Sequence, residues 1–239
     1  MSGDSGLFDA FLKALQLLLQ GDANLWNIVA LSMRTSVLAL SIASPFAIAS
    51  GYWMAVNSFR GRRFFVWLLQ TSLAFPTVLI GLLLYMLLSR HGALGQWHWL
   101  FTSKALVAGQ ALMAFPIIVA FVMSAVQSSD PRLAETAVCL GASPNQVMWR
   151  LLIECRFAVV AALIHAFGRV ISEVGCAMMV GGNIAGTTRT MTTAIALETS
   201  KGEFAQGIAL GLVLLCSALL MNAALLLVQG DLGKAGSAP

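Results

Sequence analysis

Three ionisable residues recur at intervals of four inside an apolar run of the sequence: His165, Arg169 and Glu173. On a helix, this spacing places the three side chains along one face. Insertion scales put an arginine at the centre of a membrane helix at about +2.5 to +3.5 kcal/mol, so such residues usually face a protein interior or a wet cavity. Arg169 could attract an anion while Glu173 holds the guanidinium in position. The alternative is a purely structural ion pair, with His165 as a packing group.

A polar segment rich in glycine and threonine follows that run. Gly181 and Gly182 let the backbone approach a ligand closely, and hydroxyl and amide donors at a helix N-terminus can bind an oxyanion. The polar side chains of the segment are Asn183, Thr187, Thr188, Arg189, Thr190, Thr192 and Thr193. They predict part of a translocation pathway or gate. A capped and solvated outer loop is the alternative interpretation.

A polar interruption between two other apolar runs reads as a pair of short helices. Asp130 and Ser143 are N-cap residues, and each is followed by a proline, which is favoured at the first helical position. Gly141 between them ends the first helix, and Gln146 completes a capping box with Ser143. The sequence therefore predicts a rigid, glycine-hinged knob over residues 130–146.

The composition places this knob on an integral membrane protein. Apolar residues make up 59% of the chain and charged residues 10%. Because lipid offers the backbone no hydrogen-bond partners, long apolar runs must be helices, and we predict an all-α fold. The expected spans are 35–56, 64–88, 105–127, 157–180 and 205–228, with kinks at Pro45, Pro76 and Pro116. Residues 7–20 are amphipathic and too short to span, so we expect a helix on the membrane surface, with a sixth span as the alternative.

The charge pattern predicts the orientation. Arg60, Arg62 and Arg63 sit in the short loop between the first two expected spans, which places that loop in the cytoplasm, the N-terminus outside and the C-terminus inside. The knob is then cytoplasmic. The formal net charge of +4 needs no nucleic-acid partner. The four cysteines show no metal-ligand spacing, and we expect neither a zinc site nor a disulfide.

No feature of the sequence predicts an enzyme. A phosphate-binding glycine loop is missing, so the chain itself is not expected to bind ATP, and no other cofactor is expected. An intramembrane hydrolase using His165 and Ser172 would need the two side chains within hydrogen-bond reach. Seven residues of helix separate them by about 10 Å, which excludes that pair.

The knob resembles the Glu-Ala-Ala loop of importer-type ABC transporter permeases. Its Glu135, Thr136 and Ala137 followed by Gly141 match that loop, although Thr136 replaces the usual alanine and residues 151–154 lack the usual proline. The resemblance implies that these four residues couple the chain to a separate ATP-hydrolysing subunit. An ATP-independent ion transporter is the alternative, and it would not need such a loop.

A second set of residues is similar to the oxyanion branch of these permeases, and most of all to tungstate-type permeases. It comprises Ser172-Glu173-Val174-Gly175, Gly182-Asn183 and the paired Thr192-Thr193. The resemblance implies a type I importer permease with a domain over 28–228, a surface helix over 1–27 and a cytoplasmic tail over 229–239. It further implies a homodimer in a bacterial or archaeal cytoplasmic membrane, two ABC ATPase subunits and an extracytoplasmic oxyanion-binding protein. Molybdate and sulfate remain alternative substrates.

Overall fold

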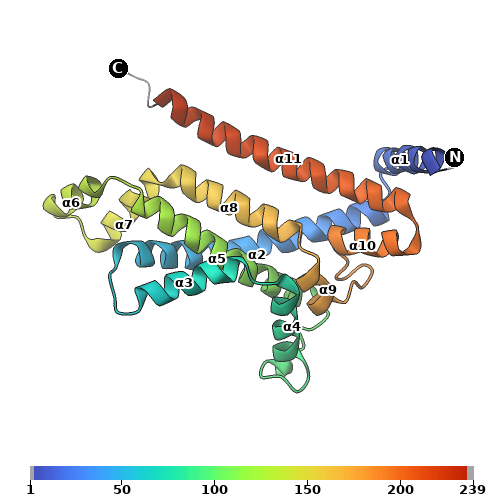
Figure 1. Ribbon diagram of the computed structural model, residues 1–239, viewed down its shortest axis with the longest axis horizontal. Coiled ribbons are helices and arrows are strands. Elements are labelled where there is room, and N and C mark those ends of the chain that lie inside the picture. The colour runs from blue at the N-terminus through green and yellow to red at the C-terminus, as the bar shows by residue number, and fades with distance from the viewer. Residues whose placement is uncertain (1–2, 236–239) are drawn as a thin grey trace. The chain divides into compact units, whose positions relative to one another are not determined.

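The computed structural model describes the backbone of residues 3–235 and the side chains of residues 9–226. Over this range the chain is all-α, as predicted, with eleven α-helices and one 3-10 turn, η1 (Figure 1). The helices are α1 (Gly3–Gln20), α2 (Ala23–Val56), α3 (Arg62–Leu73), α4 (Thr77–Leu88), α5 (Ser103–Gln127), α6 (Pro131–Cys139), α7 (Pro144–Glu154), α8 (Arg156–Ile171), α9 (Gly175–Gly181), α10 (Met191–Lys201) and α11 (Phe204–Ala235), with η1 at Gly95–Trp97.

Three of the described helices are long and apolar enough to cross a membrane: α2, α5 and the described part of α11. Two bent pairs raise the number to five if each is one span, namely α3 with α4, at 103°, and α7 with α8, at 71°. This agrees with about five predicted spans. The helix that contains the first predicted span is longer than expected, because α2 begins at Ala23 rather than near Thr35.

The second expected span, 64–88, is not one continuous helix. It divides into α3 and α4, each of 12 residues and therefore about 18 Å long, against a hydrocarbon core of about 30 Å. Pro76 stands at the break, where it removes a backbone donor and disfavours helical geometry at Phe75. Pro45 and Pro116 instead remain inside α2 and α5.

The fourth expected span, 157–180, is also interrupted. Helix α8 ends at Ile171 and α9 begins at Gly175. Glu173 therefore lies beyond the end of α8, in the break. The prediction that His165, Arg169 and Glu173 share one face of a single helix was wrong, because the helix stops between the second and third of them.

The two ends of the chain bear on the expected surface helix and tail. Helix α1 exposes Phe11, Leu12, Leu15 and Leu19, which suits a helix on a membrane surface. At the other end, α11 continues through Ala235, so most of the expected tail 229–239 is helical in its backbone. Residues 236–239 of that tail lie outside the described residues.

The chain divides into two compact units whose boundaries fall within α2, α5, α8 and α11 and between α3 and α4. The first unit comprises Met1–Ala39, Pro76–Ala111 and Gly168–Leu220, and the second comprises Leu40–Phe75, Leu112–Phe167 and Met221–Pro239. All of the predicted pathway residues belong to the first unit. All of the predicted coupling residues belong to the second.

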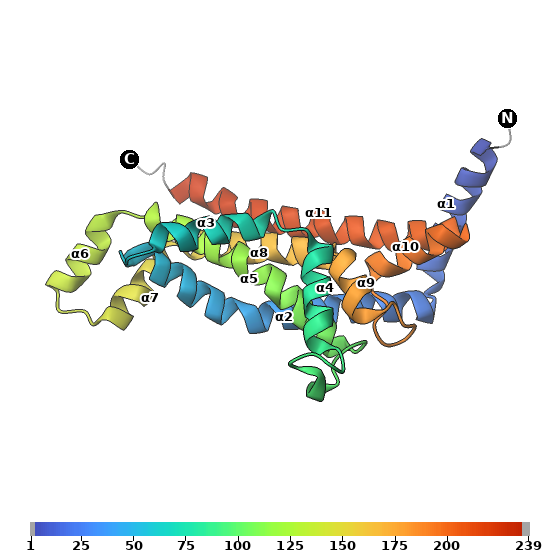
Figure 2. The same cartoon turned by 60° about the horizontal axis from the view of Figure 1, so that its bottom comes forward.

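In the first unit, α4 and α9 lie side by side in both views (Figures 1 and 2). Glycines permit the approach. A Cβ atom on Gly81 of α4 would lie 2.8 Å from Cys176 Cα, and one on Gly175 would lie 2.6 Å from Val78 Cγ2. Small residues at such crossings let membrane helices approach to backbone contact, which strengthens their packing.

This packing gives a stability prediction. Gly81→Ala should lower the melting temperature of the detergent-solubilised protein, because the added methyl group meets α9 backbone and overpacking costs about 1–3 kcal/mol. The matched control is Gly168→Ala in α8, where a Cβ atom meets nothing within 4 Å. The control should be neutral or slightly stabilising, since alanine favours a helix over glycine. Equal melting temperatures for the two variants would contradict the close α4–α9 contact.

Candidate coupling and translocation sites

Helices α6 and α7 form the predicted knob, and local hydrogen bonds set its shape. The carboxylate of Asp130 accepts from Arg132 N at 2.9 Å, and Ser143 N donates to Gln146 Oε1 at 2.8 Å. Between the helices, Gly141 has a left-handed φ of 81°, and Ala142 N donates to Ala137 O at 3.0 Å. The prediction of two short, capped helices joined by a glycine turn is confirmed.

The first helix of the knob is displayed rather than packed. No residue of α6 is buried, and Glu135 is exposed without an ion-pair partner among the described side chains. Nearby apolar side chains are exposed as well: Leu133 at 43%, Val138 at 61% and Leu140 at 83%. Several exposed apolar side chains on one short element are typical of a protein–protein contact surface.

Two of the other three residues of the predicted coupling motif line a cavity on the knob. Thr136 and Ala137 line a space of about 400 Å³ between α6 and α7, together with the charged Arg132, Arg150 and Glu154. Val147 and Leu151 of α7 are buried and anchor the second helix. Glu135 therefore lies outside this cavity, and the cavity itself is lined by both apolar and charged side chains.

Glu173 organises the break between α8 and α9. One carboxylate oxygen, Oε2, lies 2.8 Å from Arg169 Nη1, and the other accepts from Cys176 N at 3.0 Å. Its backbone oxygen accepts from the Thr192 hydroxyl at 2.6 Å. Three bonds from one residue thus join the end of α8, the first turn of α9 and the first turn of α10.

The Arg169–Glu173 pair is asymmetric in its exposure. The side chain of Glu173 is 3% exposed and that of Arg169 is 44% exposed. A buried carboxylate must be paired or hydrogen-bonded, and this one is both. Arginine carries five N–H donors, so a guanidinium that spends one on Glu173 still offers donors to an anion. The arrangement can present a fixed positive charge without exposing a carboxylate to the anion.

Four threonines of this segment, Thr188, Thr190, Thr192 and Thr193, are buried, and the hydroxyls of three of them donate a hydrogen bond to a backbone carbonyl. Thr188 donates to Gly181 O, Thr192 donates to Glu173 O, and Thr193 donates to Thr190 O at 3.1 Å. A hydroxyl has a single proton to donate, so none of the three can also donate to an oxyanion in this arrangement. These side chains hold the 181–193 segment together.

The other predicted pathway residues are more accessible. Ser172 and Thr187 are exposed, although each hydroxyl donates to a nearby carbonyl, Gly168 O and Ala185 O respectively. Asn183 and Arg189 are half-buried, and Asn183 Oδ1 and Arg189 Nε are buried without a partner among the described atoms. Buried polar atoms are nearly always paired, so these two have hydrogen-bonding capacity left for water or a ligand.

The link between Thr192 and Glu173 gives a second stability prediction. Thr192→Val keeps the shape of the side chain but removes the donor to Glu173 O. Losing a buried hydrogen bond of this kind costs about 1–3 kcal/mol, so the melting temperature of the solubilised protein should fall. Thr187→Val is the matched control, since Thr187 is exposed, and it should change stability little. A Thr192→Val variant as stable as the wild type would show that this bond does not hold the break in place.

Sequence reasoning missed polar residues on α2 and α5 that support the same region. Ser32 Oγ accepts from Met191 N, the first residue of α10, at 2.8 Å. Gln110 Nε2 donates to Ser36 Oγ at 3.3 Å, and Gln110 Oε1 is buried without a partner among the described atoms. Ser32, Thr35 and Ser36 are all buried. The sequence did contain a signal for them. Thr35 and Ser36 follow Ser32 by three and four residues inside an apolar run, and small polar residues at this spacing mark a helix face that packs against another helix.

Neither the ring of His165 nor a cysteine thiol forms a hydrogen bond with the side chain of Glu173 among the described residues. The ring of His165 lies 5.2 Å from that of Phe121, centroid to centroid, so it packs against an aromatic neighbour. All four cysteines are free thiols. Over the described residues no group of three or more metal-binding side chains occurs.

A multi-pass helical protein with an exposed, capped helix pair in a loop has the architecture of a membrane-spanning transport subunit. The chain belongs to the family described as the binding-protein-dependent transport system inner membrane component, whose model matches residues 47–233. The sequence-based assignment to the ABC permeases is therefore confirmed.

Three relatives illustrate the similarity. The tungstate uptake system permease protein TupB of Campylobacter jejuni is 39% identical over 216 residues, covering 90% of each chain. TupB of Peptoclostridium acidaminophilum is 35% identical over 223 residues, covering 93% of this chain and 98% of the relative. The molybdenum transport system permease protein ModB of Escherichia coli is 28% identical over 188 residues, covering 74% and 82%.

Solved structures confirm the fold. A bacterial ABC transporter for import of the polysaccharide alginate matches with a TM-score of 0.69 and 17% identity, covering 94% of this chain and 82% of that one. The MetNI methionine ABC transporter, in inward-facing conformations, matches with a TM-score of 0.65 and 16% identity, covering 90% and 96%.

Proposed function

We propose that this chain is the membrane-spanning subunit of a type I ABC importer that translocates an oxyanion, with tungstate as its substrate. The observation that carries the proposal is the identity of 39% and 35% to two tungstate permeases over nine-tenths or more of this chain. The molybdenum permease of E. coli reaches 28% over about three-quarters of it. Molybdate is the second candidate on that ground.

The proposed assembly is a homodimer with two ABC ATPase subunits and an extracytoplasmic oxyanion-binding protein. The α6–α7 knob would dock on an ATPase subunit, and its exposed Glu135 and apolar neighbours support that role. The orientation has the N-terminus outside and the knob in the cytoplasm, in keeping with the positive charge of the 57–63 loop. The ATPase subunits would bind and hydrolyse ATP. An ATP-independent carrier would have no binding partner for the exposed knob.

The proposed mechanism runs along the chain from the knob to the ion pair. Helix α7 is followed directly by α8, whose last turn carries Arg169. Cys155, between those helices, donates its thiol to Ala125 O of α5 at 3.4 Å, which ties the base of the knob to a second helix. Nucleotide-driven movement of the knob would shift the populations of inward-open and outward-open states. Oxyanion contact falls to the guanidinium groups of Arg169 and Arg189 and to the second amide N–H of Asn183, which have donors left. The hydroxyls of Ser172 and Thr187 already donate to carbonyl groups, and Glu173, Thr188, Thr192 and Thr193 hold the region in position.

The test is ATP hydrolysis by the chain reconstituted with its ATPase and binding protein in lipid vesicles. The binding protein is supplied in turn with tungstate, molybdate, sulfate or phosphate. We expect tungstate to stimulate hydrolysis well above the other three. Greater stimulation by molybdate would make molybdate the substrate in place of tungstate. No stimulation by any of the four oxyanions would reject oxyanion import.

A further inference from the structure

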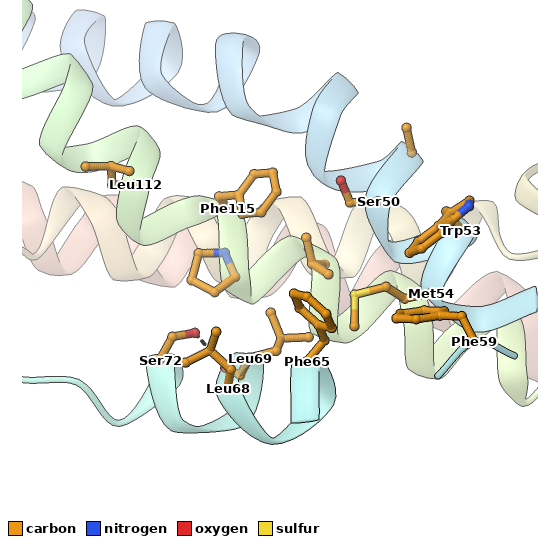
Figure 3. Close-up of a pocket in the computed structure, with 13 residues that line it drawn as sticks. Ser50, Trp53, Met54, Phe59, Phe65, Leu68, Leu69, Ser72, Leu112 and Phe115 are labelled. Carbon is orange, nitrogen blue, oxygen red and sulfur yellow. Dashed lines mark hydrogen bonds between the residues drawn. The ribbon is translucent and has the colours of Figure 1, made fainter. Parts of the chain in front are cut away.

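The second unit contains an apolar pocket with no assigned role. It has a volume of about 800 Å³ and lies between the C-terminal half of α2, α3 and α5 (Figure 3). Aromatic and aliphatic side chains supply most of its lining, including Trp53, Phe59, Phe65, Leu69 and Phe115. This volume is within the range of about 300–1,000 Å³ that small-molecule sites occupy.

The pocket offers almost nothing to a polar ligand. Its polar lining groups are the hydroxyls of Ser50 and Ser72, which are both already used, and the single indole N–H of Trp53. Ser50 donates to Phe46 O at 2.7 Å and Ser72 donates to Leu69 O at 2.6 Å, each within its own helix. The part of any ligand inside the pocket must therefore be hydrocarbon.

The segment that joins two lining residues of the pocket contains three arginines. Phe59 and Phe65 both line the pocket, and the chain between them contains Arg60, Arg62 and Arg63. Arg62 Nε donates to the backbone oxygen of Met54, another lining residue, at 3.0 Å, which fixes that guanidinium beside the pocket. Residues 40–75 contain no acidic residue, and none of the three arginines forms an ion pair with a described side chain.

An apolar slot next to an arginine-rich segment, with Arg62 held beside it, is complementary to an amphiphile with an anionic head. We propose that this pocket binds an anionic phospholipid, with an acyl chain between α2, α3 and α5 and the headgroup phosphate held by Arg60, Arg62 and Arg63. Membrane-adjacent arginine clusters attract anionic lipids, and arginine binds phosphate oxygens with paired N–H donors. A helix of a second copy could fill the apolar part, but it would leave the three charges unmatched.

The test is native mass spectrometry of the purified full-length chain with phosphatidylglycerol or phosphatidylcholine of the same acyl chains. We expect phosphatidylglycerol to bind at least tenfold more tightly. Arg60→Gln/Arg63→Gln should reduce that preference by about fivefold per arginine. This factor corresponds to the attraction of about 1 kcal/mol between one membrane-adjacent arginine and anionic lipid. Both residues are exposed, so the variant should fold. The matched control is Arg132→Gln/Arg150→Gln, which removes the same charge from the knob and should keep the preference.

A second pair of variants tests the pocket itself. Leu69→Trp fills it, whereas Leu73→Trp, on the same helix but outside the lining, does not. We expect the first to lose phosphatidylglycerol and the second to keep it. Equal binding of the two lipids, or an unchanged preference in Arg60→Gln/Arg63→Gln, would overturn the proposal. Dissociation of a dimer by Leu69→Trp with lipid binding unchanged would assign the pocket to a second copy of the chain instead.

Discussion

Replacing Glu135 by lysine should abolish substrate-stimulated ATP hydrolysis by the assembled transporter while leaving the permease folded and inserted. Glu135 is exposed on a helix with no buried residue, so its substitution removes no internal contact. Reversing a charge that pairs across an interface typically costs about 2–5 kcal/mol, which is more than a tenfold loss of the docked state. The measurement is the ATPase rate of the reconstituted complex with and without binding protein, alongside the melting temperature of the permease alone.

A matched control separates docking from a general effect of charge. Glu203→Lys makes the same change at another exposed position, outside the knob, between α10 and α11. It should leave stimulation intact. If Glu135→Lys were also stimulated normally, the carboxylate would have no part in docking, and the exposed apolar residues Leu133, Val138 and Leu140 would become the next residues to substitute.

Replacing Arg169 by alanine should reduce oxyanion uptake at least tenfold while the ATPase subunits stay attached. The substitution removes the half-exposed guanidinium, and it also leaves the buried carboxylate of Glu173 without its cation. A charge-assisted hydrogen bond is worth about 1.5–3 kcal/mol, which already corresponds to a tenfold effect or more. Uptake of radioactive or mass-detected tungstate into vesicles measures the loss, and co-purification of the ATPase reports attachment.

Two companion variants distinguish an anion contact from a structural ion pair. Arg169→Lys keeps the charge and should retain part of the uptake. Arg169→Ala/Glu173→Gln removes the uncompensated carboxylate, so it should recover stability without recovering transport. Full uptake in the double variant would show that Arg169 serves only to neutralise Glu173.

The knob could be predicted from the sequence because its rules are local. Asp130, Ser143 and Gln146 cap helices within three residues of their own positions, and Gly141 is where the backbone needs a positive φ. No distant residue has to be known to draw this conclusion.

The helix breaks could not be predicted in the same way, because apolar composition does not report continuity. Pro45 and Pro116 stay inside helices, whereas Pro76 separates two of them. What differs is the packing beyond Pro76, where Gly81 brings α4 against α9, and this contact joins residues far apart in the sequence. Without knowledge of such long-range contacts, one sequence predicts only that a proline bends its helix.

The threonine-rich segment shows the same limit at the site. Five hydroxyls close together predicted donors for an oxyanion, but the partners of Thr188 and Thr192 are the backbone oxygens of Gly181 and Glu173. The type of a residue does not reveal whether its hydroxyl group donates to a backbone carbonyl or is free to bind a ligand. The position of Glu173 in a break, rather than on α8, was hidden for the same reason.

The spacing of Arg169 and Glu173 has a consequence for biogenesis. The two residues are four apart in one apolar segment, so each can neutralise the other as soon as that segment emerges from the ribosome. Thr192 lies 19 residues further along the chain, so its hydrogen bond to Glu173 O can form only after the segment that carries the ion pair has been synthesised.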